Sequence, residues 1–134
     1  YSGHPAACAV ALKNIELIKK ENILDSVKHS IAPYLRDKWL SLGDHPIVGE
    51  ARIKGLMGAI ELTNDKVKRS RFPSDFNTGS LCRDISIKNG LVMRAVGDSM
   101  IIAPPLIITH EEIDELVDKA RTTLDETQEA VQKL

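Results

Sequence analysis

GLVMRAVGDSMIIAPPLI, residues 90–107, is an apolar stretch with a turn signal near its middle and one arginine just before that turn. The turn is VGD, residues 96–98, and the apolar residues on either side of it are typical of β-strands. Pro104 and Pro105 end the second strand because neither can donate an N–H to a neighbouring strand. The stretch therefore predicts two strands joined by a tight turn, with Arg94 at the end of the first.

A second pair of strands is predicted upstream, in PIVGEARIKGLMGAIELTN, residues 46–64. β-branched residues and glycines replace the helical period there, and the two strands meet near Lys54 and Gly55. DKVKRSRFPSD, residues 65–75, follows as a polar and basic stretch that contains a proline. It predicts a long exposed loop.

Two helices are expected before the first pair of strands. One runs from Pro5 to Lys20, since proline suits the first helical turn, where its missing N–H has no partner. The other runs from Asn22 to Leu42, with a kink at Pro33 or a division into two shorter helices. Its apolar residues recur at spacings of three and four and form one stripe, which consists of Leu24, Val27, Ile31, Leu35, Trp39 and Leu42.

Two further helices are expected on either side of residues 90–107. One runs from about Asn77 to Asn89 and ends at Gly90, the residue type preferred where the backbone turns left-handed past a helix end. The last begins at a capping box formed by Thr109 and Glu112. Its apolar stripe consists of Ile113, Leu116, Val117, Ala120, Leu124 and Val131.

The order of these elements, α-α-β-β-α-β-β-α, predicts an α+β fold. Four short strands with helices segregated along the sequence fit a mostly antiparallel four-stranded sheet with helices on one face. A chain of 134 residues that is 43% hydrophobic suits a single domain with one core. Residues 1–45 are expected to be a helical lead-in, and residues 46–134 to form the sheet and the other helices.

The charge balance argues against two classes of partner. The 18 Lys and Arg and the 19 Asp and Glu give a formal net charge of −1, so neither nucleic acid nor an anionic membrane surface is an expected partner. No stretch approaches the 18 or so apolar residues that cross a bilayer. Cys8 and Cys82 lie far apart, without a Cys-x-x-Cys motif, and Cys8 is expected to fill space in an apolar helix. This pattern favours a cytoplasmic location.

Several kinds of catalytic site are not indicated. The chain has no phosphate-binding Gly-x-x-x-x-Gly-Lys loop, no Gly-x-Ser-x-Gly elbow and no His-Glu-x-x-His helix. The four histidines show no ligand spacing, so no metal site is predicted. Cys82 is interpreted as a small hydrophobe, because no histidine neighbours it in sequence. The three methionines, Met57, Met93 and Met100, are expected in the core.

Two charged runs are interpreted as structural. The carboxylates of HEEIDELVD, residues 110–118, complement the positive end of a helix and are not read as an acid-base pair. The basic run KVKRSR, residues 66–71, lacks interleaved aromatic residues and is expected to be solvated rather than bound to nucleic acid.

Two features could bind an anion. YSGHP, residues 1–5, leads into a helix N-terminus, where backbone N–H groups would suit a phosphate or a carboxylate. Arg94 has a guanidinium group that can give a carboxylate two parallel hydrogen bonds. The alternative role for Arg94 is a salt bridge at an edge strand or between subunits. The residues alone favour this salt-bridge role.

Four blocks of the chain resemble the carboxy-terminal part of class III aminotransferases, including omega-amino-acid:pyruvate transaminases. The blocks are YSGHPAACAVALKNIELI, HPIVGEARIKGLMGAIEL, GLVMRAVGDSMIIAPPLIIT and EEIDELVDKARTTLDET. Together they cover the chain from Tyr1 to about Thr127, and their order is that of the family.

The resemblance implies the C-terminal small domain of a fold-type-I enzyme that uses pyridoxal 5'-phosphate. The large domain, with its Schiff-base lysine, would lie upstream of Tyr1, and this chain alone would be inactive. The implied reaction is ping-pong transamination, in which an amine or omega-amino acid gives its nitrogen to the cofactor and a keto acid such as pyruvate collects it. The resemblance also implies a homodimer or a larger assembly in the intact enzyme.

The resemblance assigns three site residues. Arg94 matches the family position whose arginine binds the substrate carboxylate and swings aside for an apolar group. Tyr1 and Ser2 are expected beside the cofactor, because in the family the matching stretch follows a threonine that reaches the cofactor phosphate of the partner subunit. The chain departs from the family at Ile53, where a glycine is often found.

Two alternatives stay open at this point. A related pyridoxal-phosphate decarboxylase or aminomutase would share this small domain. A stand-alone, non-catalytic binding module descended from such a domain is the alternative from a different functional class.

Overall fold

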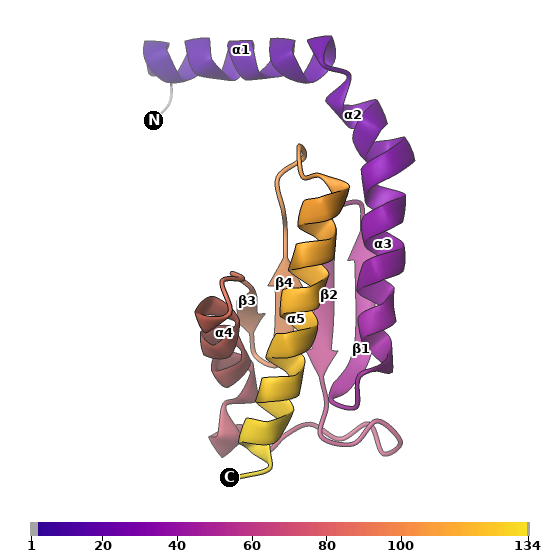
Figure 1. Ribbon diagram of the computed structural model, residues 1–134. Coiled ribbons are helices and arrows are strands. Elements are labelled where there is room, and N and C mark those ends of the chain that lie inside the picture. The colour runs from indigo at the N-terminus through magenta and orange to yellow at the C-terminus, as the bar shows by residue number, and fades with distance from the viewer. Residues whose placement is uncertain (1–2, 134) are drawn as a thin grey trace.

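The computed structural model describes residues 3–133 and contains one sheet with helices packed against it (Figure 1). The α-helices are α1 (Pro5–Lys20), α2 (Ile23–Ser26), α3 (Ala32–Leu40), α4 (Thr78–Lys88) and α5 (His110–Val131). The strands are β1 (Val48–Lys54), β2 (Met57–Leu62), β3 (Arg94–Val96) and β4 (Ser99–Ile102). Three short segments are the π-helical η1 (Val27–Ile31) and the 3-10 turns η2 (Ser41–Asp44) and η3 (Ser74–Phe76).

The four strands form an antiparallel sheet in the order β1-β2-β4-β3. Each hairpin turns at a glycine, Gly55 with a φ of +59° and Gly97 with a φ of +55°, because side chains with a β-carbon rarely adopt this conformation. β2 pairs with β4, so the two hairpins lie side by side. The predicted α+β fold is confirmed.

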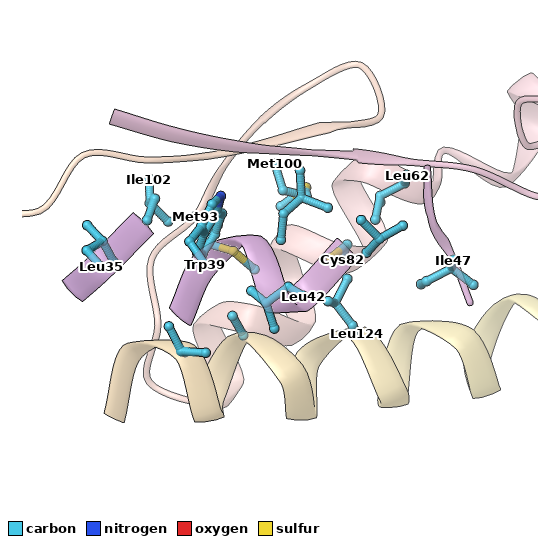
Figure 2. Packing of buried hydrophobic residues seen from close by; sticks show 14 of the residues in the cluster. Leu35, Trp39, Leu42, Ile47, Leu62, Cys82, Met93, Met100, Ile102 and Leu124 are labelled. Carbon is cyan, nitrogen blue, oxygen red and sulfur yellow. The ribbon is translucent and has the colours of Figure 1, made fainter. Parts of the chain in front are cut away.

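One face of the sheet is buried under the helices (Figure 1). Alternate residues of the two central strands are buried on this face, and they are Ile60, Leu62, Met100 and Ile102. Trp39 of α3 and Leu124 of α5 approach them from the helical side (Figure 2). Truncating a fully buried aromatic side chain to alanine costs roughly 3–5 kcal/mol, so Trp39 is a main link between α3 and the sheet.

The long second helix is divided upstream of its proline. Asn22, with a φ of +53°, separates α1 from α2, and the π-helical segment η1 separates α2 from α3. Pro33 lies in the first turn of α3. Its ring crowds the carbonyl group four residues earlier, at His29, and the wider π-helical turn around His29 accommodates this crowding. The helix is interrupted, as predicted, but by the π-helical segment upstream of Pro33 and not at Pro33 itself.

The first helix packs less than its apolar sequence suggests. No residue of α1 is buried, and α1 extends away from the sheet (Figure 1). Cys8 is therefore exposed, against the expectation that its thiol fills space inside the fold. Leu24, predicted in the apolar stripe of the second helix, is also 62% exposed.

The three methionines divide between the two faces of the sheet. Met93 and Met100 are buried, as predicted, whereas Met57 is 66% exposed and the prediction was wrong for it. Side chains along β2 alternate between the two faces of the sheet, so Met57 lies on the same face as Ala59 and on the opposite face from the buried Ile60.

The last helix and the basic loop are both tied to the core. Thr109 and Glu112 make the complete capping box at the start of α5, and the predicted stripe of α5 is buried except for Leu116, which is partly buried. In the loop over residues 65–75, Lys66 Nζ donates to the backbone oxygens of Gly43 and His45 at 2.6 and 2.9 Å. Phe72 is buried, so this loop is anchored as well as exposed. Among residues 3–133, no helix has the length and apolar content that crossing a membrane requires.

Candidate functional site

The sheet face opposite α3, α4 and α5 carries the candidate site, and we call it the open face. Two rows of residues cross it from β1 through β2 and β4 to β3. The first row is Arg52, Ala59, Ile101 and Arg94, and the second is Glu50, Glu61, Ser99 and Val96. Side chains alternate between the two faces of a sheet, and these residues belong to the opposite face from the buried strand residues. Their side chains therefore point away from the helices.

Arg94 begins β3, the strand at one edge of the sheet, so the prediction that placed it at the end of this strand was wrong. Its side chain is exposed, and it makes no ion pair and no side-chain hydrogen bond with any of residues 3–133. Its neighbour across the pair of strands is Ile101, which is partly buried. The guanidinium group therefore has all of its donors unpaired within the described residues, and an apolar surface lies beside it.

Arg52 lies at the other end of the same row and is engaged with two carboxylates. Its Nη1 lies 3.2 Å from Oε2 of Glu50, and its Nη2 lies 3.5 Å from Oε2 of Glu61. Glu61 also accepts a hydrogen bond from the hydroxyl of Ser99. Three strand spacings separate the backbones of Arg52 and Arg94, roughly 14 Å.

A shallow depression of about 310 Å³ lies on the open face next to Arg52. Its floor includes the apolar residues Met57, Ala59 and Ile101, while Arg52 and Lys54 add positive charge. Ile53, where the family often has glycine, also lines this depression and continues β1 without a break. Arg94 itself is not among the residues that line it.

The other predicted anion site lies at the start of α1. Tyr1 and Ser2 are outside the described residues. His4 caps the helix, because its Nδ1 accepts the N–H of Ala7 at 3.4 Å and its backbone oxygen accepts the N–H of Cys8 at 3.0 Å. The first turn of α1 contains no acidic residue.

The environment of Cys82 disfavours its reactive thiolate form. It is buried in α4, and burial raises the pKa of its thiol to about 11, opposed by a hydrogen bond with Thr127 that lowers it. The prediction that Cys82 is a small hydrophobe is confirmed. Among residues 3–133, no three His, Cys, Asp or Glu side chains gather so that they could hold a metal ion.

Two polar contacts that the sequence did not reveal hold the helices together. Nε2 of the buried His45 lies 3.0 Å from Oδ1 of Asp125 in α5. Asp114, predicted only to complement a helix end, lies 2.7 Å from Lys38 Nζ and accepts from Tyr34 at 2.9 Å. The partners are about 80 residues apart in each pair, and no local motif marks such contacts.

The whole chain is similar to known aminotransferases. The family model described as aminotransferase class-III matches residues 1–124. The chain is 53% identical over 131 residues to a putrescine–pyruvate aminotransferase of Pseudomonas aeruginosa, which covers 98% of the chain and 28% of that protein. It is 38% identical over 134 residues to the mitochondrial gamma aminobutyrate transaminase 1 of Solanum lycopersicum, which covers 100% of the chain and 26% of that protein. The chain thus spans about a quarter of the length of these relatives.

Solved structures show the same architecture. The crystal structure of an omega-transferase from Vibrio fluvialis matches with a TM-score of 0.92 at 31% identity, over 99% of this chain and 32% of that one. The crystal structure of an (S)-enantioselective omega-transaminase from Thermomicrobium roseum matches with a TM-score of 0.87 at 34% identity, over 93% of this chain and 28% of that one.

Proposed function

Because the chain belongs to the class III aminotransferases, we propose that residues 1–134 are the C-terminal small domain of a longer transaminase. The proposed reaction moves an amino group from an amine or omega-amino acid to a keto acid such as pyruvate. The named activity of the relative from Pseudomonas aeruginosa supports this choice of donor and acceptor. The Schiff-base lysine is proposed to lie in the rest of the protein. In this domain, residues 1–45 form a helical lead-in and residues 46–134 the sheet and the other helices.

Arg94 is the proposed binding residue for the substrate carboxylate. The observation that supports this role is its exposed guanidinium group, which has no partner among residues 3–133. A guanidinium group can give a carboxylate two parallel hydrogen bonds, and it keeps its charge at every physiological pH. Ile101 and Ala59 continue the row beside Arg94, so an apolar part of the substrate would find an apolar surface there.

The cofactor proposed for the intact enzyme is pyridoxal 5'-phosphate, which when bound supplies the electron sink for amino transfer. The start of α1 suits a neighbouring phosphate, because no acidic residue occupies its first turn and the positive end of the helix dipole lies there. Tyr1 and Ser2 are proposed as neighbours of that phosphate. Most of the cofactor would be held by the rest of the protein.

A homodimer or larger assembly in the cytoplasm is proposed for the intact enzyme. α1 exposes Val10, Leu12 and Ile15 at 68%, 70% and 50%, so this helix needs a covering surface. Both Cys8 and Cys82 are free thiols, which suits a reducing compartment.

The proposal is tested by Arg94→Ala in the full-length enzyme. Losing a charge-assisted pair of hydrogen bonds removes about 1.5–3 kcal/mol, so KM for pyruvate should rise roughly 10- to 150-fold. KM for a diamine without a carboxylate, such as putrescine, should stay within about twofold of the wild-type value, because the lost group has no partner on that substrate.

The matched control for this experiment is Arg52→Ala, which removes the other arginine of the same row. It should leave KM for both substrates unchanged. If Arg94→Ala raised KM for pyruvate and for the diamine equally, the proposed role of Arg94 would be wrong.

A further inference from the structure

The N-terminus of α4 is in direct contact with the turn that follows Arg94. The backbone N–H of Gly79 donates to Oδ1 of Asp98 at 3.1 Å. Asn77, the N-cap residue of α4, makes no side-chain capping bond within the described part of the chain. Asp98 therefore caps α4 from a turn that is 19 residues away in sequence, and its negative charge lies at the positive end of the helix dipole.

Gly79 permits this contact because it has no side chain. A β-carbon at position 79 would lie 1.9 Å from the backbone oxygen of Gly97 and 3.2 Å from Cα of Asp98. The helix backbone thus lies directly against the backbone of the β3–β4 turn, with no space for a methyl group between them.

α4 also holds the other end of the segment that contains Arg94. Past the helix end, the N–H of Leu91 donates to the backbone oxygen of Ser86 at 2.8 Å, and Met93 is buried in the core. Between these two anchors, β3 has only three residues and pairs with β4 alone. The position of Arg94 therefore depends on α4 at both ends.

Asp98 connects α4 to the centre of the sheet as well. Its backbone oxygen accepts the N–H of Leu62, the last residue of β2, at 2.9 Å. Asp98 thus contacts α4 through its side chain and β2 through its backbone. Loss of the carboxylate would release the turn from α4 while the bond to β2 remained.

From this geometry we infer that Asp98 is a positioning residue for carboxylate recognition, because it fixes the strand that presents Arg94 to the substrate. The inference rests on the proposed function of Arg94. Asp98 acts through Arg94 and contacts no substrate.

The test uses the full-length enzyme with Asp98→Ala and Asp98→Asn. Asp98→Ala should raise KM for pyruvate about 3- to 10-fold, as expected when one hydrogen bond of the support is lost. KM for a diamine and kcat at saturating pyruvate should stay within about twofold. Asp98→Asn keeps an oxygen acceptor for Gly79 N–H and should restore KM for pyruvate to within about twofold of the wild-type value.

The double variant Arg94→Ala with Asp98→Ala separates the inference from the proposed function. If Asp98 acts through Arg94, the double variant should have the same KM for pyruvate as Arg94→Ala alone. If Arg94→Ala itself showed no selective effect on pyruvate, the proposed function would fail. If Arg94→Ala were selective but the two effects multiplied, the inference about Asp98 would fail while the role of Arg94 stood.

A loss of folding in Asp98→Ala would be recognised by alkylation of the buried Cys82, followed by peptide mass spectrometry. In that case Asp98→Glu tests whether Asp98 positions Arg94. It keeps the carboxylate but lengthens the side chain, so it should move the turn and raise KM for pyruvate selectively. Wild-type KM values in Asp98→Glu, or equal rises for both substrates, would overturn the inference.

Discussion

Arg52 and Arg94 stand at opposite ends of one row across the open face, but only one of them is paired within the described chain. Arg52 lies on the seven-residue β1, between Glu50 and Glu61. Arg94 lies on the three-residue β3 and has no partner among residues 3–133. The fold itself satisfies the first charge and leaves the second without a partner among the described residues. This difference is the reason for proposing a structural role for Arg52 and a binding role for Arg94.

The two edges of the sheet are also supported differently. β1 pairs with β2 from Val48 to Lys54, with one bulge at Gly49, and packs against α3. β3 depends on α4, whose two ends hold the segment around Arg94. A perturbation of α4 should therefore disturb the Arg94 edge and leave the Arg52 edge in place.

The largest expected effect comes from Gly79→Ala. The added methyl group would lie 1.9 Å from the backbone oxygen of Gly97, and neither backbone can move without breaking the contact. We expect a loss of more than about 3 kcal/mol in the stability of the α4–β3 region. The measurement is the alkylation rate of Cys82 in the full-length protein, which should increase strongly because Cys82 lies in α4 and is buried.

Gly55→Ala in the β1–β2 turn is the matched control for Gly79→Ala. Its φ is +59°, and no atom of residues 3–133 lies within 4 Å of the added β-carbon, so only backbone strain of about 1–2 kcal/mol is expected. Alkylation of Cys82 should change little. Equal alkylation rates in the two variants would show that the two halves of the sheet open together and that α4 does not support β3 separately.

A smaller effect is expected from Arg52→Ala. The two ion pairs of Arg52 are surface pairs, with its side chain 47% exposed, and such pairs contribute about 0–1 kcal/mol. The free energy of unfolding should fall by less than about 1 kcal/mol, and KM for pyruvate should not change. Denaturant titration and steady-state kinetics check the two values.

The same variant also tests whether Arg52 binds substrate. A selective rise in KM for pyruvate in this variant would mean that Arg52 binds substrate despite its carboxylate partners. The structural assignment of Arg52 would then be wrong.

Much of the fold could be predicted because its signals are local. Gly55 and Gly97 mark the two turns, and Thr109 with Glu112 marks the start of α5. The exposure of Met57 could also have been predicted from the sequence, because alternation along the strand places it on the opposite face from Ile60 and Leu62. The prediction missed it because methionine was judged by its residue type rather than by its phase.

The contacts that support the site could not be predicted, because they join residues far apart in sequence. Asp98 has the sequence context of an ordinary turn residue, and its bond to Gly79 exists only once α4 has packed against the hairpin. Arg94 could be recognised as a charge in an apolar stretch. Arg94 differs from Arg52 in having no partner among the described residues. That difference could be recognised only from the positions of the neighbouring carboxylates in the folded chain.

The smallest expected effect concerns the contact between α3, which packs behind β1, and α5. The hydrogen bonds from Lys38 and, next, Tyr34 lower the pKa of Asp114 below its ordinary value of 3.8, and the hydrogen bond to Asp114 raises the pKa of Lys38 above 10.5. The stabilisation from Asp114 is therefore present above pH 3.8 and lost as the pH falls through its lowered pKa. That from Lys38 is present below pH 10.5 and lost as the pH rises through its raised pKa.

The measurement for this contact is amide hydrogen exchange of α3 relative to α4, compared between wild type and Asp114→Asn at each pH. At neutral pH, α3 should exchange faster in Asp114→Asn, and the difference should vanish well below pH 3.8, where the wild-type carboxyl is protonated. Glu115→Gln is the control, because Glu115 pairs with Lys119 within α5 and should leave α3 unaffected. A difference that persisted in strong acid would mean that packing, and not charge, holds α3 to α5 at the Arg52 edge.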